Sequence, residues 1–163
     1  MTDITYTNTA TERTDSTGTI AGKGNANAVQ KLVCASVELA ASASGVTVKL
    51  GRIKSDARIM ATGLVYNDDL ATSGSPTLDI GLGSVDSNIT SDPDALNNGI
   101  ALSSATSTTT VIADAANVGK RAWEFVSGQT TDPGGFLDVY ATVKDAATTA
   151  TGTVAVEMTG YFD

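Results

Sequence analysis

The sequence predicts an all-β protein: an antiparallel β-sandwich, jelly-roll-like, with about eight strands and at most one short helix. Apolar residues alternate with polar ones along several short segments, which is typical of strands with one buried face. Turn-forming Gly, Pro, Asn and Asp separate these segments. The chain has 163 residues, of which 41% are apolar and only 5% aromatic. We therefore expect one core built from Val, Ile, Leu and Ala.

The chain divides into two regions near residue 28. Residues 1–28 are rich in Thr and poor in large apolar side chains. Thr favours an extended backbone, but such a segment cannot bury enough surface to order by itself. We expect an N-terminal arm that orders against a sheet edge, its own or a neighbour's, with a disordered tail as the alternative. Residues 29–163 are expected to form the sandwich.

Three strands are expected in the first part of the sandwich. Residues 29–39 alternate with period two, and so do residues 46–54. In the second segment the apolar phase slips by one at Ile53, which predicts a β-bulge at Gly51. Residues 57–66 are apolar on both faces. That pattern predicts a central strand.

The middle of the chain contains a strand with two informative glycines. Residues 78–83 alternate, and the polar positions at 81 and 83 are Gly. The missing side chains predict a close approach by another backbone at Gly81 and Gly83. Residues 92–99 begin with Asp-Pro and end with Gly, which predicts a short helix. Residues 106–113 are expected to form a strand.

The C-terminal part is expected to complete the sandwich. Residues 114–117 are predicted to form a helical turn or a loop. Residues 121–126 are interpreted as a strand, and its Trp123 is expected to pack on the core or a sheet face and not to serve as a ligand platform. Residues 137–143 and 153–162 alternate clearly. The last of these strands is expected to lie inside a sheet.

The sequence contains few of the residues that catalysis and metal binding require. It contains no His and one Cys, so Ser–His, Cys–His and zinc sites lack their residues. We expect no catalytic residues, no metal site, no cofactor and no enzymatic activity. Cys34 is expected to be a small packed residue. An irregular calcium site at residues 67–69, Asn-Asp-Asp, is the alternative that remains open.

The charge distribution limits the partners. A net charge of −8 argues against nucleic acid. No apolar run approaches the roughly 18 residues of a membrane span, and the N-terminus lacks the pattern of a signal peptide. Four of the ten basic residues lie within ten positions. They form either a solvated hairpin or a surface that orients the protein on a partner or on its own copies. The candidate partner-binding residues are Ile4, Tyr6, Lys49, Arg52, Lys54 and Arg58.

Residues 57–66, 75–82 and 151–161 carry a resemblance in pattern and composition. In these stretches the chain resembles small β-sandwich virion structural proteins of tailed bacteriophages, of the capsid decoration (cement) or head-fibre type. The resemblance implies a non-enzymatic protein made in the host cytoplasm. It also implies many copies on the capsid exterior, bound to the major capsid protein or another virion protein, and a homo-oligomer, with a trimer favoured.

Two other functions remain alternatives. One is a tail-tube or tail-fibre component of the same kind of virion. The other, from a different class, is a carbohydrate-binding or adhesive β-sandwich module. The scarcity of aromatic residues counts against the second alternative, because sugar-binding surfaces favour exposed aromatic rings.

Overall fold

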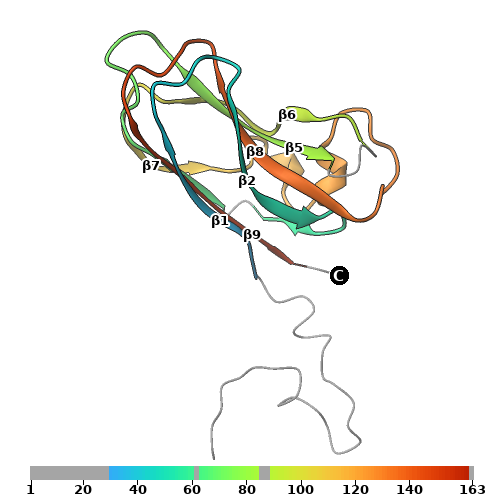
Figure 1. Cartoon of the computed structure of the whole chain (residues 1–163). Helices are drawn as coiled ribbons and strands as arrows, with labels where there is room; N and C mark the ends of the chain where they lie inside the picture. The colour runs from blue at the N-terminus through green and yellow to red at the C-terminus, as the bar shows by residue number, and fades with distance from the viewer. Residues whose placement is uncertain (1–29, 61–62, 85–88, 162–163) are drawn as a thin grey trace, which may run out of the picture.

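The computed structural model describes residues 30–60, 63–84 and 89–161. Two antiparallel sheets pack face to face (Figure 1), so the predicted β-sandwich is confirmed. Sheet 1 consists, in spatial order, of β1 (Gln30–Leu39), β9 (Gly152–Tyr161), β4 (Leu64–Asn67) and β7 (Thr106–Thr110), with β3 (Arg58–Ile59) also paired with β9. Sheet 2 consists of β2 (Thr47–Lys54), β8 (Phe136–Lys144), β5 (Thr77–Ser84) and β6 (Asp92–Ala101).

The strand order is jelly-roll-like. β3 and β4 both pair with β9, and together they occupy the place of one interrupted strand. β1 then pairs with β9, β2 with β8, β4 with β7 and β5 with β6. Such nested pairing arises when a long antiparallel hairpin folds over into two sheets. The segment 57–66 therefore lies in the middle of sheet 1, as expected, but it is divided into the two short strands β3 and β4.

Two elements differ from the sequence prediction. Residues 92–99 belong to strand β6 and not to a helix. The Asp-Pro start is only a local signal, whereas pairing with β5 buries Leu96 and Ile100 in the core, and tertiary contacts override a weak local preference. Residues 121–126 contain a 3-10 helix, η2 (Ala122–Phe125), and not a strand.

The sequence of η2 explains its shape. Ala122 and Phe125 are its buried residues, and a spacing of three matches one turn of a 3-10 helix. The Glu124 carboxylate accepts a hydrogen bond from the Arg121 backbone N–H at 2.7 Å, which closes the first turn. Trp123 packs against the core, as expected. The predicted turn at residues 114–117 is confirmed as η1 (Ala115–Asn117).

The bulge in β2 is confirmed. Lys49 lies opposite Tyr140 and Gly51 lies opposite Val139, so Leu50 is the extra residue. Leu50 is buried. The bulge therefore shifts the alternation of β2 by one residue, so that the apolar residues on both sides of the shift face the core.

Strand β9 forms the middle of sheet 1. It is paired with β1 on one side and with β3 and β4 on the other, which confirms that the last strand is structural. Val154, Val156 and Met158 are at most 1% exposed. Phe162, the last residue of the segment expected to alternate, lies outside the described residues.

Cys34 differs from the expectation of a packed side chain. It is exposed on β1 and lies opposite Glu157 of β9. The reason is the pleat, because Val33, Ala35 and Val37 pair with inward-facing residues of β9 and the residues between them point outward.

Candidate functional site

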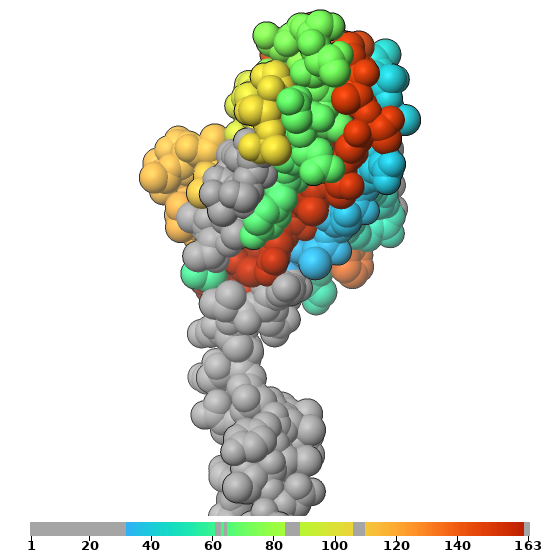
Figure 2. Space-filling model, turned by 90° about the vertical axis from the view of Figure 1, so that its left-hand side faces the viewer, coloured from blue at the N-terminus to red at the C-terminus, as the bar shows by residue number. Residues whose placement is uncertain are grey.

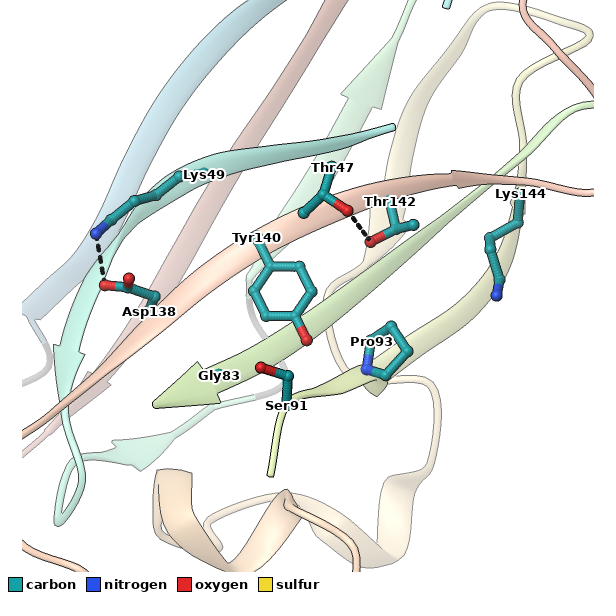
Figure 3. A pocket seen from close by; sticks show the side chains of 9 residues that line it. All are labelled: Thr47, Lys49, Gly83, Ser91, Pro93, Asp138, Tyr140, Thr142 and Lys144. Atoms are coloured by element: carbon teal, nitrogen blue, oxygen red, sulfur yellow. Dashed lines mark hydrogen bonds and ion pairs between the residues drawn. The ribbon is translucent and has the colours of Figure 1, made fainter. Parts of the chain in front are cut away.

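A hollow of about 640 Å³ lies on the outer face of sheet 2 (Figure 3), and we call it the sheet-2 hollow. Strands β2, β5, β6 and β8 and the residue before β6 all contribute to it. Its lining residues are Thr47, Lys49, Gly83, Ser91, Pro93, Asp138, Tyr140, Thr142 and Lys144. The hollow is open to solvent, so any ligand would contact the protein from one side.

Two glycines make room for the start of β6. A Cβ atom at Gly81 would lie 2.5 Å from the carbonyl oxygen of Pro93. One at Gly83 would lie 2.9 Å from the Ser91 hydroxyl and 3.0 Å from a ring carbon of Tyr140. The predicted close approach of another backbone is thereby confirmed at Gly81. Gly83 instead accommodates two side chains that form the hollow.

Tyr140 forms the floor of the sheet-2 hollow. Its hydroxyl donates a hydrogen bond to the Leu82 carbonyl oxygen at 3.2 Å. Figure 3 shows Ser91 beside the Tyr140 hydroxyl and the ring nearly face-on. Burial raises the pKa of Tyr140, the hydrogen bond with Ser91 lowers it, and the negative charges of Asp92 and Asp94 raise it again, with a net upward shift. The hydroxyl is therefore a neutral donor at physiological pH.

One end of the hollow carries a carboxylate shared by two cations. Oδ1 of Asp138 lies 2.6 Å from Nζ of Lys49 and 2.9 Å from Nε of Arg52. Burial raises the pKa of the Asp138 carboxyl, but the hydrogen bonds and positive charges of Lys49 and Arg52 outweigh that effect. The pKa of Asp138 lies below its usual value as a result, and its carboxylate is charged at neutral pH.

The other end of the hollow is lined by hydroxyls and an amine. The hydroxyls of Thr47 and Thr142 lie 3.3 Å apart across the β2–β8 pair. Lys144 lies beyond them at the end of β8, where a smaller hollow of about 180 Å³ begins. The site as a whole therefore contains hydrogen-bond donors and acceptors around one aromatic ring.

The predicted partner-binding cations do not all come together. Lys49 and Arg52 meet on Asp138, and Lys54 lies opposite Phe136 at the end of β2. Arg58 lies in sheet 1, on β3, where its guanidinium donates to the Gly119 carbonyl oxygen at 2.8 Å. The basic cluster is thus divided between the two sheets. Ile4 and Tyr6 lie outside the described residues.

In the alternative calcium site at residues 67–69, the two carboxylates accept hydrogen bonds from backbone N–H groups. Oδ2 of Asp68 accepts a hydrogen bond from the Thr153 N–H at 2.8 Å, and Oδ1 of Asp69 accepts one from the Ala71 N–H at 3.1 Å. Within residues 30–60, 63–84 and 89–161, no group of three or more His, Cys, Asp or Glu side chains is placed to hold a metal ion. In the same residues, no helix is long and apolar enough to cross a membrane.

Sequence reasoning missed most of the sheet-2 hollow. It selected Lys49 but not Asp138, Tyr140 or Lys144. A usable signal was present, because the outward positions of β8 carry Asp, Tyr, Thr and Lys, while the outward positions of β5 include two Gly. Polar side chains that flank a strand with glycines at outward positions indicate a depression in the sheet. The pairing of β8 with β5, however, cannot be derived from either segment alone.

The outer face of sheet 1 is different in character. Figure 2 shows β9 as a red band between the blue of β1 and the green of β4. Along these three strands the described outward side chains include only two charged residues, Glu38 and Glu157. The others are Cys34, Ser36, Tyr66, Thr153, Ala155, Thr159 and Tyr161.

Comparisons with known proteins give one structural similarity. No protein-family model and no curated protein matches the sequence. The fold is similar to a chain of a solved structure described as the "Cyanophage Pam1 capsid asymmetric unit", with a TM-score of 0.55 and 18% sequence identity. The match covers 85% of this chain and 87% of that chain, so the two chains have nearly equal lengths. At this identity the similarity concerns the fold.

Proposed function

We propose that this chain is a capsid decoration, or cement, protein of a tailed bacteriophage. In this role it binds the major capsid protein on the outside of the capsid in many copies and carries out no chemistry. The fold similarity to a chain of a phage capsid asymmetric unit carries the proposal, because it extends over most of both chains. A chain in the asymmetric unit of a symmetric shell is repeated at every equivalent position.

The two-sheet core supports the proposal. Its buried residues belong to both sheets and form one continuous cluster, as a rigid, repeated building block requires. The described outward side chains of β1, β9 and β4, on the outer face of sheet 1, also support it, because only two of them are charged and charged side chains are depleted in the centres of protein interfaces. We assign contacts between copies, in a trimer, to this face.

The N-terminal arm completes the proposal. Residues 1–28 precede β1, which is an edge strand of sheet 1. A Thr-rich arm gains little by packing on its own core, but it gains main-chain hydrogen bonds by adding to an exposed strand edge of a neighbour. Ile4 and Tyr6 are its anchoring side chains in this proposal.

Quantitative mass spectrometry on particles of the phage that encodes the chain tests the proposal. Separated capsids and tails should give the full chain at a fixed copy number on capsids. A variant lacking residues 1–28 should keep its β-sheet circular dichroism and show reduced occupancy on capsids. Sedimentation equilibrium of the full chain should give three times the monomer mass of 16.5 kDa. Recovery of the chain with the tails, or its absence from particles, would refute the proposal.

A further inference from the structure

We propose that the sheet-2 hollow binds a neutral oligosaccharide, with the exposed face of Tyr140 as the stacking platform. This binding function is separate from attachment to a capsid. It rests on the shape of the hollow, on its aromatic floor and on the mixed polarity of its rim. A volume of about 640 Å³ falls within the range of small-molecule sites, roughly 300–1,000 Å³.

The floor has the geometry of a stacking surface. Gly81 lies opposite Tyr140 on the neighbouring strand, and Gly83 lies directly beneath part of the ring. The ring therefore packs closely against Gly83, where β5 has no side chain, and Tyr140 lines the hollow (Figure 3). A flat aromatic face packs well against the C–H face of a pyranose ring. The phenol group keeps a polar contact at its own edge.

The rim has the polarity that a sugar requires. Each sugar hydroxyl is both a donor and an acceptor, so a sugar site needs both kinds of group. The Asp138 carboxylate accepts, the Lys144 ammonium donates, and the hydroxyls of Thr47 and Ser91 do either. These groups come from β2, β8 and the residue before β6, and they surround the ring of Tyr140.

Other ligand classes fit the hollow less well. Of the two lysines in the rim, Lys49 is already paired with Asp138, so an anion would depend on Lys144 and would also meet the carboxylates of Asp92 and Asp94 near Tyr140. An apolar ligand would leave the polar rim groups without partners, at a cost for each. A peptide strand finds no free backbone edge at the floor, because β5 and β8 are each already paired on both sides.

Amide chemical shifts of the full-length, isotopically labelled chain test this proposal. The probes are cellotriose, maltotriose, mannotriose and the trimer of N-acetylglucosamine, with inorganic phosphate as a fifth, anionic probe. At least one trisaccharide should shift the amides of Gly83, Ser91, Tyr140 and Lys144. The open shape predicts weak binding, with a dissociation constant on the order of 1 mM.

Variants make the test specific. Tyr140→Ala should weaken binding of the active trisaccharide by about tenfold or more, which corresponds to at least 1.4 kcal/mol. The matched control is Tyr66→Ala, which removes an outward tyrosine from sheet 1 and should leave the affinity unchanged. If Tyr140→Ala does not fold, Thr47→Arg replaces it, because this exposed rim residue can carry a long side chain that blocks the hollow without entering the core.

Three results would overturn the proposal. The first is that no trisaccharide shifts the four named amides. The second is equal affinity of the wild type and a folded Tyr140→Ala or Thr47→Arg variant. The third is that phosphate shifts these amides while the neutral sugars do not, which would identify an anion site at Lys49 and Lys144. None of these measurements involves a virion, so their outcome does not depend on the decoration function.

Discussion

The outer face of sheet 1 and the outer face of sheet 2 are built on the same pleated scaffold but carry different side chains. Sheet 1 presents mainly small, neutral residues along β1 and β9, whereas sheet 2 presents Tyr140, Asp138 and several cations around a hollow. Both inner faces are buried in one core. Alternation determines which residues point inward, whereas the outward residues are free to differ between the two sheets.

The difference begins with the strand that lies at the centre of each face. β9 places a side chain at each of its outward positions from Thr153 to Tyr161. In contrast, β5 carries Gly81 and Gly83 there, and the start of β6 uses the space. The two glycines thus let the start of β6 and the ring of Tyr140 pack closely on sheet 2, whereas β9 carries a side chain at every outward position.

The largest expected effect comes from removing the central strand of sheet 1. Truncation after Gly152 deletes the buried side chains of Val154, Val156 and Met158. Burial contributes about 1.5–3 kcal/mol for each such side chain, so the loss is comparable to the whole stability of a domain, about 5–15 kcal/mol. We expect no cooperative melting transition by circular dichroism. The full-length chain is the control and should melt cooperatively.

The next effect distinguishes close packing from backbone conformation. Gly81→Ala places a Cβ atom against the Pro93 backbone, which cannot rotate away, and should cost about 3 kcal/mol, the upper end of the overpacking range. Gly135→Ala meets no atom within 4 Å but has a φ of +73°, and should cost about 1 kcal/mol. Urea denaturation of both variants measures the difference. Equal costs would mean that the β6 backbone does not pack tightly against Gly81.

A smaller and pH-dependent effect is expected at Asp138. Its pKa in the folded state is lowered, so its contribution is present above the unfolded pKa, about 3.9, and is lost as the pH falls through the folded value. At pH 7, Asp138→Asn should cost about 0.5–1 kcal/mol. The deficit should shrink in acid below the unfolded pKa. Asp56→Asn, at an exposed turn residue, is the control, and a deficit independent of pH would contradict the ion-pair explanation.

The smallest effect concerns the basic residues of β2. Replacing Lys49, Arg52 and Lys54 together with Ser should weaken self-association or capsid binding modestly, because two of these cations already pair with Asp138. The effect should be seen at low salt and disappear at high salt, where the Debye length falls to about 3 Å. Sedimentation velocity at both salt concentrations measures it. An unchanged association at low salt would mean that these basic residues only face solvent and do not contact a partner.

Much of the sandwich could be predicted from local patterns. The inward faces of β1, β8 and β9 and the bulge before Gly51 follow from period-two alternation. Prediction failed where a local signal competed with pairing, as in β6, or where the alternation was short enough to fit a 3-10 helix, as in η2. In both cases the deciding contacts come from residues distant in the sequence.

The candidate site was largely beyond sequence reasoning for a related reason. The hollow depends on β8 lying beside β5, and on Ser91 and Pro93 crossing the two glycines of β5. A count of aromatic residues gave a low expectation for sugar binding, because composition does not say which face a ring occupies. The proposed role of Tyr140 depends on its position above Gly83, which the number of aromatic residues in the chain does not reveal.

Cryo-electron microscopy of phage virions purified from a host that expresses the chain tests the proposed decoration function most directly. Two-sheet density should repeat with icosahedral symmetry on the outer surface of the capsid, with the outer face of sheet 1 covered by neighbouring copies. In the same map the hollow beside Tyr140 should be open to solvent. Density for this chain in the tail, or a capsid surface without it, would contradict the decoration function.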